Sequence, residues 1–118
     1  MKNLIASAVL LMFVSPALMA APAGDAAVGK DVYTKRCAVC HADDGSGNTQ
    51  MVAAFGPPPP PDFRSKQVQS MTDAQFKSTI MDGKGRMPKV TTVNDDDAAN
   101  IIAYIRTLPK VHPMAPAK

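Results

Sequence analysis

The sequence predicts a small all-α domain, because three stretches have helical patterns and no stretch has the alternation typical of a strand. The three stretches cover residues 25 to about 40, 72–83 and 94–108. Each begins with a capping residue and has apolar side chains three or four positions apart, as in a helix with one buried face. The chain has 118 residues, enough for one small domain.

The first two helices have clear starting residues. Asp25 is a favourable N-cap for the first, whose apolar residues at helical spacing are Val28, Val32 and Tyr33. The second opens with a capping box, in which Thr72 and Gln75 satisfy each other's backbone groups, and it ends at Gly83.

The third helix is the most strongly patterned. Asn94 precedes three aspartates, whose negative charge complements the positive end of the helix dipole. A continuous apolar stripe follows, and Pro109 ends the helix; the stripe consists of Ala98, Ile101, Ile102, Ile105 and Leu108. We therefore expect this helix to be packed.

Between the helices, residues 42–50 are rich in turn formers, and residues 57–61 are five prolines that exclude a helix and favour polyproline II.

The amino terminus has the features of a secretory signal peptide. Lys2 is followed by an apolar segment over residues 4–14, too short to span a membrane, and then by Ser15, Pro16 and small residues. We expect residues 1–20 to be removed, with cleavage between about residues 20 and 23. The mature protein is then periplasmic, without membrane insertion. It consists of a domain over residues 24–109 and a Pro-rich flexible tail over residues 110–118.

The motif that carries the chemistry is Cys37-Ala38-Val39-Cys40-His41, a C-x-x-C-H signature of covalent haem attachment. Cysteines three apart on a helix lie on one face, so both sulfurs reach the two vinyl groups at one haem edge. His41 can then present an imidazole nitrogen to the iron. The pattern predicts one covalently bound haem c, which also adds apolar bulk to a small core.

Three other uses of these cysteines are less consistent with the sequence. A thioredoxin-like pair would accompany a βαβ pattern, and no strands are evident. A zinc site would need two histidines besides the two cysteines. The chain has only His41 and His112, and the adjacent Cys40 and His41 would strain a tetrahedral centre. A disulfide between Cys37 and Cys40 fits only as an off-pathway product.

The second axial ligand is predicted to be Met87, because methionine with histidine is the ligand pair of electron-carrying cytochromes c. Met87 lies in a glycine-containing loop, and Pro88 restricts it to extended conformations. Met71 and Met81 are interpreted as core residues. The remaining alternatives are Met51, Met114, His112 or an open coordination position.

With these motifs, the chain resembles the class I c-type cytochromes, small monohaem carriers of bacterial and photosynthetic type, over about residues 24 to 108. The matching segments, in order, are residues 29–33, 37–41, 83–88 and 101–105. The resemblance implies three to five helices wrapped around one covalently attached haem, and an electron shuttle with an exposed haem edge. It also implies a proline carbonyl that accepts the proton of the outer nitrogen of His41. Among the five prolines, we choose Pro57.

These observations predict a periplasmic one-electron carrier and not an enzyme, because filled axial positions keep substrates from the iron. The alternatives are a ligand-binding or sensing haem protein, a peroxidase-like enzyme, and a dedicated haem subunit of a larger oxidoreductase complex.

The net charge of +3 is too small and too scattered along the chain to indicate nucleic acid as a partner. We expect a monomer whose partners are redox proteins. Their acidic surfaces would meet a basic rim made of Lys35, Arg36, Lys84, Arg86 and Lys89.

Overall fold

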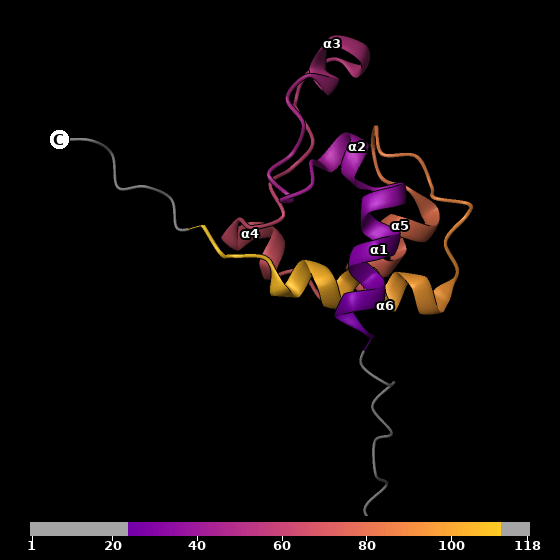
Figure 1. The fold of residues 1–118 in the computed structure, drawn as a ribbon. Helices are drawn as coiled ribbons and strands as arrows, with labels where there is room; N and C mark the ends of the chain where they lie inside the picture. The colour runs from indigo at the N-terminus through magenta and orange to yellow at the C-terminus, as the bar shows by residue number, and fades with distance from the viewer. Residues whose placement is uncertain (1–23, 112–118) are drawn as a thin grey trace, which may run out of the picture.

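A computed structural model describes residues 24–111, and the part of the chain that it describes is all-α (Figure 1). The predicted signal peptide and its cleavage region, and the alternative ligands His112 and Met114, lie outside the described residues. Within residues 24–111 the helices are connected by loops, and the β-type pairings are isolated bridges. None of the helices described here combines the length and apolar character needed to cross a membrane.

Two helices from opposite ends of the domain, α1 (Ala26–Arg36) and α6 (Asp95–Thr107), cross each other (Figure 1). Both starts were predicted correctly. The Asp25 carboxylate accepts hydrogen bonds from two α1 amides, and Asn94 forms a capping box with Asp97. The crossing is tight at Gly29, where an added Cβ would lie 1.8 Å from the carbonyl oxygen of Asn100. A glycine at this position therefore allows the two backbones to come together.

The core is built on the apolar face of α6. The residues of α6 that are buried in the core are the predicted Ala98, Ile101, Ile102 and Ile105. Leu108, directly after the helix, is also buried, as predicted. On α1 the prediction was partly wrong. Tyr33 is fully buried, but Val28 is 46% exposed, and the residue that shares the buried face with Tyr33 is Gly29. The reason is the close crossing, which leaves room for a glycine and an aromatic ring.

Helix α5 (Asp73–Asp82) also follows the prediction, with Thr72 in a capping box and Gly83 at its end. The short helix α4 (Lys66–Gln69) was not predicted. Arg106 of α6 connects these two helices: its guanidinium donates to the carbonyls of Gln69 and Met71 and to the Asp73 carboxylate, and it lies over the Phe76 ring. The junction between α4 and α5 is thereby held against α6.

The predicted first helix is shorter than expected. It ends at Arg36, and Cys37 separates it from a further turn, α2 (Ala38–His41). After a loop comes α3 (Met51–Phe55), which has no buried residue and stands away from the other helices (Figure 1). At the other end of the domain, the Val111 amide donates to the Arg64 carbonyl, so the chain is still paired within the region expected to be a flexible tail.

Candidate haem site

The helical turn α2 brings together the three residues of the predicted attachment motif. Cys37 is its N-cap, and the Cys37 carbonyl accepts hydrogen bonds from the amides of Cys40 and His41. Cys37 and His41 are buried, with exposed fractions of 8% and 6%, and Cys40 is half-buried. Both thiols are free. The bonds to the Cys37 carbonyl thus hold both sulfurs and the imidazole within one turn.

Burial shifts the pKa values of Cys37 and His41. It raises the pKa of the Cys37 thiol to about 11, with the neighbouring Cys40 as a second cause. It lowers the pKa of His41 to about 4, so the imidazole is neutral at pH 7. The buried Nδ1 atom of His41 has no hydrogen-bond partner among the described residues. Two thiols and a neutral imidazole in one turn match the needs of haem c, so these residues fit the group.

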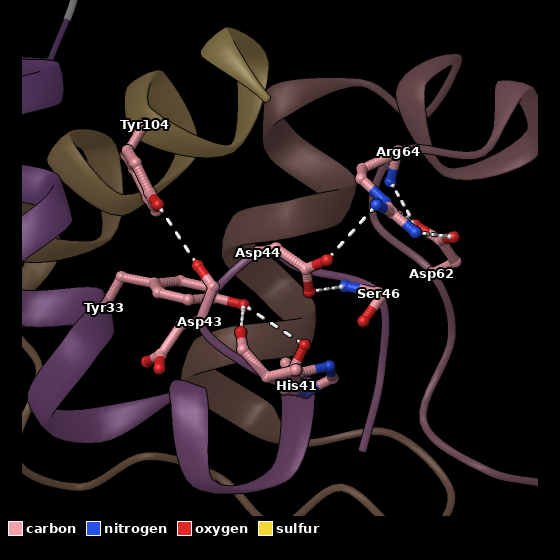
Figure 2. A network of polar contacts seen from close by, with 9 residues as sticks. Tyr33, His41, Asp43, Asp44, Ser46, Asp62, Arg64 and Tyr104 are labelled. Carbon is pink, nitrogen blue, oxygen red and sulfur yellow. Dashed lines mark hydrogen bonds and ion pairs between the residues drawn. The ribbon is translucent and has the colours of Figure 1, made fainter. Parts of the chain in front are cut away.

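The backbone directly after His41 has an unusual conformation. Ala42 has a φ of 63° and a ψ of 159°, a combination that residues other than glycine seldom adopt. The hydroxyl of Tyr33 lies 2.7 Å from the Ala42 carbonyl oxygen and 3.4 Å from that of His41, and the hydroxyl of Tyr104 lies 3.4 Å from the Asp43 carbonyl oxygen (Figure 2). Two tyrosines therefore contact the chain where it leaves the motif.

The loop that follows His41 is connected to the segment that follows the prolines. Arg64 pairs with Asp62 at 2.9 Å and with Asp44 at 3.2 Å (Figure 2). Hydrogen bonds lower the pKa of both carboxyls: the bond from Arg64 is the main cause for Asp62, and the bond from Ser46 is the main cause for Asp44. Phe63, which lies between Asp62 and Arg64 in the sequence, is buried, and its ring is stacked on that of His41.

The loop with Met87 is a tight reversal of the chain. Lys84 and Met87 exchange two backbone hydrogen bonds of 2.9 and 3.0 Å. Gly83, with a φ of 80°, lies so close to this reversal that a Cβ would be 2.8 Å from the Met87 carbonyl oxygen. Met87 is half-buried, and it is not one of the described side chains that pack against the core. Its thioether is thus left outside the core of the protein.

The other methionines differ from Met87. Met71 and Met81 pack against the core, as predicted, and Met51 begins α3. An open hollow of about 620 Å³ lies beside α5 and is lined in part by Met71, Ser78 and Lys84. No residue of the C-x-x-C-H motif lines it. We therefore do not associate this hollow with the attachment site.

The Pro57 carbonyl has a different partner from the one predicted. It accepts a hydrogen bond from the Arg86 guanidinium, whereas the predicted bond from His41 is not formed. The Arg86 contact connects the methionine loop to the proline segment, because Arg86 directly precedes Met87. Since Phe63, at the end of the same segment, contacts His41, residues 56–63 touch both predicted ligand regions.

Sequence reasoning did not identify Phe63, Arg64 or Tyr104 as neighbours of the site. Phe63 could have been found, because it is the first large apolar residue after the prolines and phenylalanine is among the residues most often buried. The contacts of Arg64 with Asp44 and of Tyr104 with Asp43 had no local signal, since they join positions 20 and 61 residues apart.

Comparison with known proteins finds a matching family and a similar solved structure. A family model described as "Cytochrome C oxidase, cbb3-type, subunit III" matches residues 24–105. Among solved structures, the "KustC0563 c-type cytochrome" is similar, with a TM-score of 0.57 and 19% sequence identity over 70% of this chain and 98% of that one. At this identity the structural likeness concerns the fold.

Proposed function

Because this chain belongs to the family described as cytochrome C oxidase, cbb3-type, subunit III, we propose that it carries single electrons between redox partners in the periplasm. It is a c-type cytochrome with covalently bound haem c, and the proposed iron ligands are His41 and Met87. Cys37 and Cys40 hold the haem edge as thioethers. The bound haem supplies the one-electron ferric–ferrous couple.

The observation that carries this proposal is the composition of the α2 turn. Its imidazole is buried, neutral and without a partner at Nδ1 among the described residues, and it shares one turn with two free thiols. A buried, neutral imidazole beside two free thiols is the set of groups that covalent haem attachment needs, which supports a role for His41 in binding a group not made of protein. The burial of His41 also limits the access of water to the imidazole.

The assignment of Met87 is supported by its place outside the core and by the fixed shape of its loop. Optical spectra of the ferric and ferrous protein test it. We expect low-spin haem and the weak far-red band of methionine bound to ferric iron. Met87→Ala should abolish that band and open the iron to carbon monoxide, whereas Met81→Leu and Met51→Leu should keep it.

Two results would contradict the ligand assignment. One is a Met87→Ala protein that retains the far-red band, which would place another residue on the iron. The other is rapid binding of carbon monoxide by the unmodified ferrous protein at neutral pH, which would instead favour a ligand-binding haem protein. Export is tested separately, by fractionating cells and determining the first residue of the mature protein, expected between residues 21 and 24.

The family description favours one other function, that of a haem subunit within a larger oxidoreductase complex. Purification from the native membrane and soluble fractions distinguishes the two. A free carrier remains in the soluble fraction as a single chain of its own mass, whereas a subunit accompanies other chains in a fixed ratio.

A further inference from the structure

Both tyrosines of the chain contact the short segment that leaves the haem motif. Tyr33 comes from α1 and Tyr104 from α6, and their rings lie 5.1 Å apart between centroids. Their hydroxyls lie near three consecutive carbonyl oxygens, those of His41, Ala42 and Asp43 (Figure 2). The crossing of the two main helices is thereby connected to the backbone of the candidate iron ligand.

The contacts are not equal in strength. A hydroxyl has one proton, and the ordinary distance between oxygens in such a bond is about 2.7–2.8 Å. The bond from Tyr33 to the Ala42 carbonyl, at 2.7 Å, fits this value, and both contacts at 3.4 Å are long. The main hydrogen bond therefore acts on Ala42, the residue whose backbone is strained.

Strain at Ala42 needs a compensating interaction. An alanine with a φ of 63° and a ψ of 159° persists only where its surroundings hold it. The direction of the Ala42 carbonyl sets ψ at this residue, and the hydroxyl of Tyr33 bonds that carbonyl. Tyr33 itself is fully buried, and its ring is held on α1 against the rings of Phe63 and Tyr104. Burial also raises its pKa far above neutral, so the hydroxyl remains a donor.

We propose that Tyr33 is a positioning residue for His41: its hydroxyl holds the strained Ala42 backbone and thereby fixes the direction of the imidazole toward the haem iron. The proposal rests on the proposed function, because it takes His41 as an axial ligand. It does not depend on Met87, which would act on the opposite face of the ring.

The experiment uses the ferric holoprotein and Tyr33→Phe, which removes the hydroxyl but keeps the ring. We measure Tm, and the proton NMR shifts of the haem methyl groups, whose spread depends on the orientation of the axial ligands. We expect Tm to fall by roughly 4–8 °C, the shift for one lost hydrogen bond in a domain of this size. We also expect the methyl shifts to move, which loss of stability alone would not cause.

Ala42→Gly provides the second arm. Glycine adopts this backbone conformation without strain, so the variant should have a higher Tm than the wild-type protein, and Tyr33→Phe should lower Tm by less in its background. Because this arm leaves Tyr33 in place, it remains informative if Tyr33→Phe fails to fold. Tyr104→Phe is the matched control, and its longer contact predicts unchanged methyl shifts.

Two results would overturn the proposal: unchanged methyl shifts in Tyr33→Phe, or no rise in Tm for Ala42→Gly together with equal losses of Tm in both backgrounds. A wrong assignment of the iron ligands would give different results. In that case His41→Ala would retain the wild-type haem spectrum, or Met87→Ala would retain the far-red band, and neither result depends on the Tyr33 hydroxyl.

Discussion

The imidazole of His41 is stacked on the ring of Phe63, with centroids 4.3 Å apart and planes inclined by 22°. The position of Phe63 is set by its backbone: its amide donates to the Gly45 carbonyl, and its carbonyl accepts from the Gln69 side chain. The turn after the haem motif and the short helix α4 therefore both orient the aromatic ring that covers His41.

Replacing Phe63 should expose His41 and weaken the domain. We expect Phe63→Ala to lower the free energy of unfolding by about 3–4 kcal/mol, and Phe63→Leu to have a smaller effect, because leucine refills most of the space. Denaturant unfolding of the ferric protein, followed at the haem absorption, measures both. Phe55→Ala is the matched control, since Phe55 is 59% exposed and its loss should change little. Equal stabilities for Phe63→Ala and Phe55→Ala would contradict this role.

The crossing of α1 and α6 depends on Gly29. In Gly29→Ala the new Cβ would overlap the Asn100 carbonyl and push the helices apart, so we expect a loss of about 3 kcal/mol in the free energy of unfolding. Thermal unfolding of the holoprotein provides the measurement. Lys30→Ala, at the exposed neighbouring position, should have nearly the wild-type Tm. A fully stable Gly29→Ala protein would show that the helices cross less closely than described.

The ion pair between Arg64 and Asp62 predicts how stability depends on pH. The pKa of Asp62 is lowered in the folded protein, mainly by its hydrogen bond from Arg64. Its contribution is therefore present above the ordinary carboxyl pKa of about 4 and is lost as the pH falls through the lower folded value. Asp62→Asn should reduce Tm at pH 7 and match the wild-type protein at strongly acidic pH. A constant difference in Tm across this range would contradict the assignment.

The basic rim predicts salt-dependent electron transfer. All five of its residues are exposed, and none of them forms an ion pair with another residue in the described part of the chain. We expect Lys84→Gln with Lys89→Gln to slow reduction by an acidic redox protein several-fold at low salt, and to have little effect at high salt. Lys66→Gln with Lys110→Gln, two exposed lysines outside the rim, is the control with the same change of charge. Equal rates for the double variant and the control at low salt would contradict steering by this rim.

Local patterns were sufficient to predict the three long helices, their caps and the haem motif. Capping boxes, an apolar stripe and the C-x-x-C-H spacing act over a few residues, so they are visible in the chain before it folds. The break at Cys37 and the short helices α3 and α4 were missed, because four or five residues have too little pattern to indicate a helix.

The surroundings of the site follow from contacts between distant segments. Arg86 lies 29 residues from its partner Pro57, and Tyr104 lies 61 residues from Asp43, so no local pattern could have paired them. Residue type and spacing indicate which side chains can hold a haem, since that depends on their chemistry. The packing of α1 on α6 determines which groups surround them, because it places Tyr33 beside Ala42 and the turn of Gly45 against Phe63.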